Sequence, residues 1–327
     1  MKNTFLAILI TLLLAPAAIA QTTERAYVAN FADDFISVID VAARQKIADV
    51  KTGKNPHGVA VSPDRQIVAV SNEGDNTISL IRTGDLAVFK TIPVGSKPHQ
   101  LVFSPDGKHL FVAINGEHRL DVISSDSWAV VENIPVGRQP HIVLALPGGS
   151  LLVTSEADQK LVKVNAETMQ VTAEISVFGY PRVMVASPDG KFAYLTQRWL
   201  NGMVKVDLEQ NKIVGWTQLP PATGFDSEGK VAHGLAVSPD GKLVYLSSQL
   251  ANNMSVIDVQ KNRVVRTFKV GKNPNWIELT EDGKYAVVSN TSSNDATLVD
   301  LKKNKAIGTI PVGKSPKRLT ISAEIKK

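Results

Sequence analysis

The stretch "NPHGVAVSPD" at residues 55–64 decides the fold, because close copies of it recur along the chain. The copies read "KPHQLVFSPDG" at 97–107, "QPHIVLALPGG" at 139–149 and "VAHGLAVSPDG" at 231–241. Each copy places a histidine just before an apolar run and a turn, although the 327-residue chain has only 6 histidines. A repeat of this kind governs the architecture, so its period is established before any other feature.

The position of His57 in the repeat measures this period, and we call it the ring position. Its successive spacings are 42, 42, 41, 51, 42 and 42 residues, so one repeat is enlarged. Seven equivalents at nearly constant spacing predict seven structural units. The residues at the ring position are His57, His99, His141, Arg182, His233, Asn275 and Lys317.

Each unit contains four short segments typical of β-strands. In the unit that starts at His57 they read "GVAVS", "IVAVSN", "TISLIR" and "AVFKTIPV". These runs are rich in Val and Ile and are bounded by Pro-Asp or Asn/Gly/Asp clusters, as strands and hairpins require. Units of about 40–45 residues with four strands each are typical of β-propeller blades. The sequence therefore predicts an all-β protein, a seven-bladed β-propeller with four antiparallel strands per blade.

The two ends of the chain predict how the ring closes. "RAYVAN" at 25–30 matches the second strand of a unit, and "SPKRLTIS" at 315–322 matches a first strand. One blade should therefore take its innermost strand from the C-terminus and its three outer strands from the N-terminus. Such pairing leaves no open sheet edge in the ring.

Three segments carry a resemblance to a known family. "AYVANFADDFISVIDV" at 26–41, "IPVGSKPHQLVFSPDGKHLFVAIN" at 92–115 and "NMSVIDVQKNRVVRTFKVGKNP" at 253–274 resemble the YVTN-repeat, or YncE-like, seven-bladed propellers. The resemblance covers residues 21–327 and implies secreted or periplasmic proteins that are mostly not enzymes. A weaker likeness links the architecture to the haem-binding propeller of cytochrome cd-type nitrite reductases, which use channel histidines at the haem.

The first twenty residues, "MKNTFLAILITLLLAPAAIA", have the layout of a secretory signal peptide. They predict cleavage after Ala20, a single propeller domain over 21–327, and a periplasmic or secreted protein. The apolar core of this leader is short for a membrane span and no later stretch is longer, so we expect no membrane insertion. The chain has no cysteine, which excludes disulfides and thiolate metal sites.

The direction of the strands places the function at one mouth of the channel. In a four-stranded antiparallel blade, the connections that precede the ring position emerge on the same side as those between the second and third strands. First strands line the axis, so the ring positions should encircle one channel mouth. Every one of these side chains can donate a hydrogen bond, none is acidic, and a basic funnel concentrates anions. The predicted ligand-binding residues are His57, His99, His141, Arg182, His233, Asn275, Lys317, Trp199 and Arg198.

Three interpretations of the ring stay open. The histidines can end a strand, hydrogen-bond a loop and have been copied by duplication. They can belong to a mouth that binds an anionic small molecule or a protein partner. Alternatively, His57, His99, His141 and His233 can ligate a transition metal or a haem-type macrocycle, with a carrier or redox role. Nucleic acid is not supported, because single strands need stacking aromatics and aromatic residues make up only 6% of the chain.

Catalytic motifs do not add to this prediction. The sequence has no Gly-x-Ser-x-Gly elbow, phosphate-binding loop or His-Glu-x-x-His helix. Propeller lactonases and lyases usually hold a divalent ion with acidic and amide residues, whereas the corresponding positions here are basic. The sequence therefore favours a binding protein over an enzyme, and the formal charge of +5 is too mild for a nucleic-acid signature.

Overall fold

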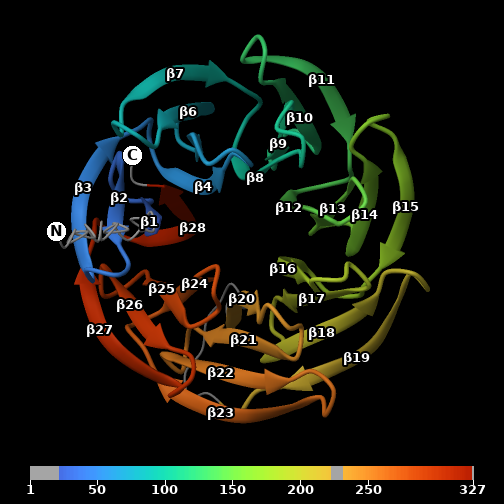
Figure 1. Cartoon of the computed structure of the whole chain (residues 1–327). Coiled ribbons are helices and arrows are strands. Elements are labelled where there is room, and N and C mark those ends of the chain that lie inside the picture. Colours follow the sequence, from blue (N-terminus) through green and yellow to red (C-terminus); the bar gives the residue numbers. More distant parts are fainter. Residues whose placement is uncertain (1–21, 222–230, 326–327) are drawn as a thin grey trace, which may run out of the picture.

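Each repeat unit folds into one four-stranded antiparallel sheet, and seven such sheets form a closed ring around a central axis (Figure 1). This arrangement comes from a computed structural model that describes residues 22–221 and 231–325. The predicted fold class, the number of blades and the strand count per blade are confirmed. The predicted signal peptide over residues 1–20 lies outside the described residues.

The strands fall into four classes by their distance from the channel. The innermost strands are β28 (Pro316–Ile325), β4 (Pro56–Val61), β8 (Pro98–Phe103), β12 (Pro140–Ala145), β16 (Pro181–Ala186), β20 (Ala232–Val237) and β24 (Pro274–Leu279). The second strands are β1 (Thr22–Asn30), β5 (Ile67–Asn72), β9 (His109–Ile114), β13 (Ser150–Ser155), β17 (Phe192–Gln197), β21 (Leu243–Ser248) and β25 (Tyr285–Asn290).

The two outer classes complete the blades. The third strands are β2 (Phe35–Asp40), β6 (Thr77–Arg82), β10 (Arg119–Ser124), β14 (Lys160–Asn165), β18 (Gly202–Asp207), β22 (Asn253–Asp258) and β26 (Asp295–Asp300). The outermost strands are β3 (Gln45–Lys51), β7 (Val88–Pro93), β11 (Ala129–Pro135), β15 (Val171–Ser176), β19 (Lys212–Gln218), β23 (Arg263–Lys269) and β27 (Lys305–Pro311).

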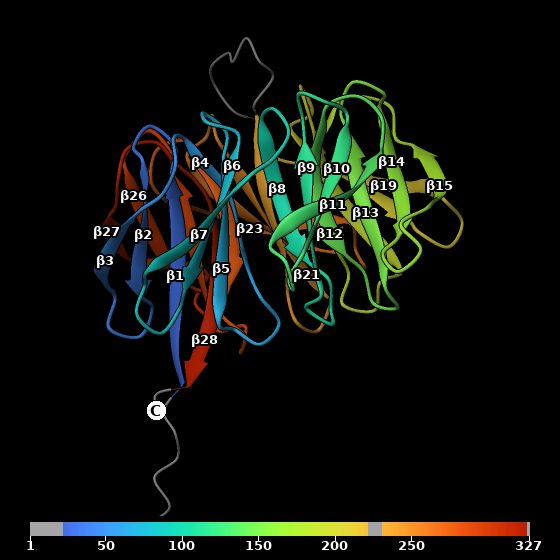
Figure 2. The same cartoon turned by 90° about the horizontal axis from the view of Figure 1, so that it is seen from above.

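The ring closes through the pairing that the sequence predicts. β28 is the innermost strand of the blade whose order is β28-β1-β2-β3, and Ala26 pairs with Ile321 in antiparallel register. In the edge-on view of Figure 2, β28 runs through the ring and its end projects at the face opposite the channel mouth. The N- and C-terminal segments are therefore joined in one sheet, which ties the ends of the chain together.

The core lies between neighbouring blades. The second strands are buried almost without interruption, as in β5, where five consecutive residues from Val68 to Asn72 are buried. Both faces of these strands pack against an adjacent sheet, which explains why they read as continuous apolar runs. The outermost strands are mainly exposed, and β11 has six exposed residues and only Ile134 buried. No helix in the described ranges is long and apolar enough to cross a membrane.

Candidate functional site

A β-bulge places the ring-position side chains at the channel mouth. In β4, Pro56 pairs with Asn72 and Val59 pairs with Val70, so His57 and Gly58 together oppose a single residue. The same two-against-one register occurs in six of the seven innermost strands. A bulge of this kind bends the strand and redirects its side chains. In the closing blade, the two residues of this bulge are Lys317 and Arg318.

Side-chain hydroxyls on the second strands hold these bulges and join the blades. Ser71 Oγ accepts a hydrogen bond from the amide of Gly58 at 2.8 Å and donates to the carbonyl of His99 in the next blade at 2.6 Å. Thr196 makes the equivalent link between the amide of Val183 and the carbonyl of His233. Backbone groups that the bulge leaves unpaired are thus satisfied, as buried backbone groups must be.

Three of the four ring histidines converge. The ring centroids of His57 and His99 are 4.5 Å apart, those of His99 and His141 are 4.9 Å apart, and those of His57 and His141 are 6.3 Å apart. No ring contact among the described residues joins His233 to this group. The four-histidine metal set stays a prediction, but the geometry gathers only the three that lie on consecutive blades.

Two histidines connect neighbouring blades. His141 Nδ1 lies 3.0 Å from the carbonyl oxygen of Arg182, and His233 Nδ1 lies 2.7 Å from the carbonyl oxygen of Asn275. A carbonyl can only accept, so Nδ1 donates in both rings and each Nε2 carries the lone pair. His141 and His233 therefore have the structural role that was one of the three open interpretations.

The other two histidines lack this link. Nδ1 of His57 and Nδ1 of His99 are buried and have no hydrogen-bond partner in the described structure. Buried polar atoms without a partner are uncommon in proteins and need an explanation.

Arg318 is the functional candidate that sequence reasoning missed. It follows the ring residue Lys317 and is 2% exposed. Its guanidinium donates to Gln100 Oε1 at 3.0 Å, approaches the His141 ring nitrogens at 3.1 and 3.2 Å, and lies 5.2 Å from the Trp276 ring centroid. Among the described residues, no carboxylate oxygen lies within 4.0 Å of it. A buried arginine is normally paired with an anion.

Two described carboxylates, those of Glu156 and Glu73, lie among the basic side chains of the mouth. Arg182 Nε lies 3.6 Å from Glu156 Oε1, and Arg198 lies 3.5 Å from Glu156 Oε2. Among the described residues, the ion-pair partner of Glu73 is His99, at 3.6 Å. In this part of the chain the basic side chains of Arg182, Arg198 and Arg318 lie near the carboxylates of Glu73 and Glu156.

Burial and these cations keep the histidines neutral. The pKa values of His57, His99, His141 and His233 are lowered well below 6.5, mainly by burial and then by the positive charge of Arg318 or Arg182. Burial also lowers the pKa of Arg318 from 12.5 to about 9, and Arg182 lowers it further, against the opposing effect of Glu73 and Glu156. An additional negative charge in the mouth would relieve this energetic cost.

The other predicted residues lie around the rim. Trp199 is 59% exposed in the β17–β18 connection, and its ring lies 5.8 Å from that of Tyr180. Arg198 lies over the same tyrosine. The amine of Lys317 lies 3.4 Å from the ring centroid of Phe31, and Asn275 is 8% exposed.

The channel below the mouth contains one unexpected carboxyl. Glu278 is half-buried in β24, and Trp276 Nε1 donates to its Oε2 at 3.3 Å. Burial raises the pKa of Glu278 to about 7. Aligning the seven first strands could have revealed both Glu278 and Arg318, because their equivalents elsewhere are mostly apolar residues or glycine.

The fold defines the class of this protein as a seven-bladed β-propeller, and its site is a ring of polar and basic side chains at one end of the innermost strands. The chain belongs to the YNCE-like beta-propeller family, whose model matches residues 6–144 and 220–323. The resemblance in the repeat motifs is thereby confirmed. No curated protein matches the chain by sequence.

Solved structures share the fold at low sequence identity. Hydrazine synthase from Kuenenia stuttgartiensis is 19% identical with a TM-score of 0.73, over 84% of this chain and 91% of that one. The Pseudomonas aeruginosa periplasmic gluconolactonase PpgL is 20% identical with a TM-score of 0.75, over 93% of this chain and 100% of its own. The dihydro-heme d1 dehydrogenase NirN in complex with DHE is 17% identical with a TM-score of 0.64, over 90% and 74% of the respective chains. At this identity these likenesses support the architecture and not a shared activity.

Proposed function

We propose that this protein binds an anionic small molecule at the channel mouth. The observation that carries the proposal is the buried Arg318 guanidinium, which among the described residues donates hydrogen bonds only to Gln100 Oε1 and His141 Nε2, both on neutral side chains. Holding such a charge away from water without an anion is expensive, and a bound carboxylate or phosphate would supply the missing partner.

The neighbouring side chains fit the same ligand class. Arg182, Arg198 and Lys317 lie around the mouth, and planar guanidinium groups match carboxylates in a bidentate geometry. The exposed Trp199 beside Tyr180 offers an apolar surface at the rim for the body of an organic anion. An acidic macrocycle of the haem type belongs to this class, since it combines carboxylates with a large flat ring.

The proposal is tested by a ligand screen at low ionic strength. Inorganic phosphate, acetate, succinate, citrate and haemin are titrated while the melting temperature is followed, and hits are measured by calorimetry. We expect at least one hit whose affinity falls with added salt. Arg318→Met and Arg182→Met should abolish it, while Arg266→Met, on the exposed strand β23, should retain it. A ligand bound equally by Arg318→Met would contradict the proposal.

We also propose that the protein is exported, with residues 1–20 removed. The leader composition carries this proposal, and the absence of cysteine suits an oxidising compartment. Mass spectrometry of protein recovered from its native host should find a chain that begins at Gln21. A chain that retains Met1 would contradict it.

A further inference from the structure

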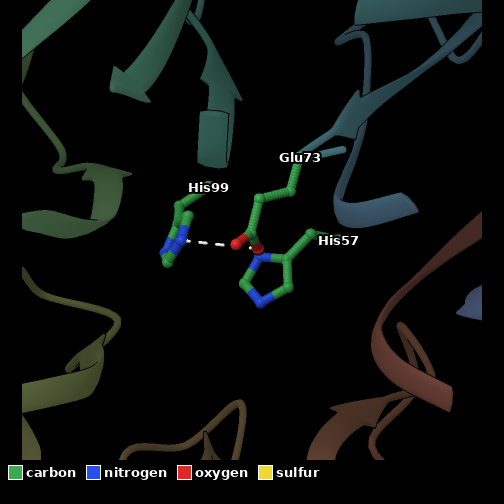
Figure 3. A group of neighbouring side chains, drawn as sticks. All are labelled: His57, Glu73 and His99. Atoms are coloured by element: carbon green, nitrogen blue, oxygen red, sulfur yellow. Dashed lines mark ion pairs between the residues drawn. The ribbon is translucent and has the colours of Figure 1, made fainter. Parts of the chain in front are cut away.

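One group of side chains beside the anion site has the composition of a metal centre. His57, Glu73 and His99 each offer a ligand atom, and these atoms lie within 4.8 Å of one another. Figure 3 shows the Glu73 carboxylate between the two imidazoles, with all three side chains directed toward one another. Glu73 comes from the β5–β6 connection, whereas the histidines come from β4 and β8.

The hydrogen bonds at the mouth separate these two histidines from the others. His141 and His233 use Nδ1 to bind the next blade, and His141 also contacts Arg318. His57 is 6% exposed, and its Nδ1 has no partner in the described structure; the same holds for Nδ1 of His99. Histidines at the same repeat position therefore differ in their contacts: His141 and His233 bind the next blade, whereas His57 and His99, whose Nδ1 atoms lack a partner in the described structure, lie beside Glu73.

The spacing requires only small movements to hold an ion. Two ligand atoms at about 2.1 Å from a tetrahedral ion lie about 3.4 Å apart. Glu73 Oε2 and His99 Nε2 are already 3.6 Å apart, and the widest separation in the group is below 4.8 Å. Rotation of the Glu73 side chain, whose exposure is 23%, can adjust the distance of its carboxylate from both imidazoles without moving a strand.

We infer that His57, Glu73 and His99 form a binding site for a divalent first-row transition-metal ion. Two imidazoles and one carboxylate suit zinc and its neighbours, and they leave a coordination position open to water or another ligand. This site goes beyond the proposed anion binding and does not depend on it. It also differs from the four-histidine set, because His141 and His233 have structural partners.

The local charge supports the site. Arg318 opposes a bare cation, whereas the negative charge of Glu73 attracts one and already acts on Arg318. The carboxylate is therefore essential to the site.

The test measures metal binding directly in an anion-poor, non-coordinating buffer. Chelator-treated protein is titrated with Zn²⁺ by calorimetry, and Co²⁺ serves as a spectroscopic probe of the ligand geometry. We expect one Zn²⁺ per chain and a fall in affinity of about tenfold or more for Glu73→Gln and for His57→Ala. Arg318→Met should still bind Zn²⁺, so a failure of the anion proposal and a failure of this one are distinguishable.

His109→Ala is the matched control, because His109 lies far from the ring position. It is the first residue of β9, and its amide donates to Ser104 Oγ in the turn before that strand, on the face opposite the mouth. Glu73→Gln retains the size and polarity of a partly exposed side chain, and its circular dichroism should match that of the parent. The inference is overturned if Zn²⁺ fails to bind, or if Glu73→Gln and His57→Ala bind it as tightly as the His109→Ala control.

Discussion

Replacing Arg318 by methionine should stabilise the ligand-free protein while removing anion binding. The pKa of Arg318 lies at about 9 instead of 12.5, chiefly because the guanidinium is buried. At about 1.4 kcal/mol per pKa unit, keeping this charge in the folded state at neutral pH costs about 5 kcal/mol. Methionine fills a similar volume and carries no charge.

Part of this gain is offset by interactions that the variant loses. Gln100 and His141 lose a donor, and Trp276 loses a cation over its ring. Such losses amount to about 1 kcal/mol each. The net effect is a free energy of unfolding about 2 kcal/mol higher than that of the parent, which corresponds to a rise in melting temperature of about 4 °C.

Urea denaturation in dilute buffer measures this effect, with Arg266→Met as the control for the change in net charge. Adding a binding anion at about 100 times its dissociation constant should stabilise the parent by about 2.7 kcal/mol and leave Arg318→Met unchanged. Because about 2.7 kcal/mol exceeds the difference of about 2 kcal/mol in buffer, the parent should become the more stable protein when the ligand is present. An Arg318→Met protein that is less stable than the parent in buffer and still responds to the anion would refute the reasoning.

Three further predictions concern the channel and its mouth. Glu278→Gln should be more stable than the parent at pH 8 by at most about 3 kcal/mol, and the two should converge near pH 4.5. The sign follows because the folded carboxyl, with its pKa of about 7, retains a proton that the unfolded chain releases above pH 4.5. The stability of the parent therefore falls as the pH rises from about 4.5 to about 7. The same difference in urea midpoint between variant and parent at both pH values would count against this prediction. Gly58→Ala should lower the free energy of unfolding by about 3 kcal/mol, because a Cβ there would lie 2.3 Å from the His99 carbonyl oxygen. Gly308→Ala is the control, because the space around Gly308 is open and the urea midpoint should change little. Trp199→Ala should change stability by less than about 0.5 kcal/mol because the side chain is exposed, yet weaken calorimetric binding of an aromatic anion severalfold; unchanged affinity would place the ligand away from the rim.

Much of the architecture was predictable because it depends on local patterns. The spacing of the ring position gave the number of blades, and the Val- and Ile-rich runs marked the strands, as the sheet pairings confirm. The match of "RAYVAN" and "SPKRLTIS" to different strands of one unit predicted the closure of β28 on β1. Strand periodicity and turn chemistry act over a few residues, so a single sequence displays them.

The site was predictable only in outline. The sequence indicated a polar, mostly basic ring at one mouth, and the structure places His57, His99 and His141 together there. An alignment of the seven first strands marks Arg318 as unusual, but it does not reveal the partners Gln100 and His141, which are 218 and 177 residues away along the chain.

The sequence by itself determined a seven-bladed propeller, its closure and the face on which histidines and cations gather. Only the tertiary structure decided which histidines are engaged and which are available. His141 Nδ1 donates to a carbonyl of the next blade, whereas His57 Nδ1 has no hydrogen-bond partner among the described residues. These partners belong to different repeats, and their distances depend on how the blades close around the channel. A repeat pattern specifies each blade, but the chemistry of the mouth arises from contacts between blades.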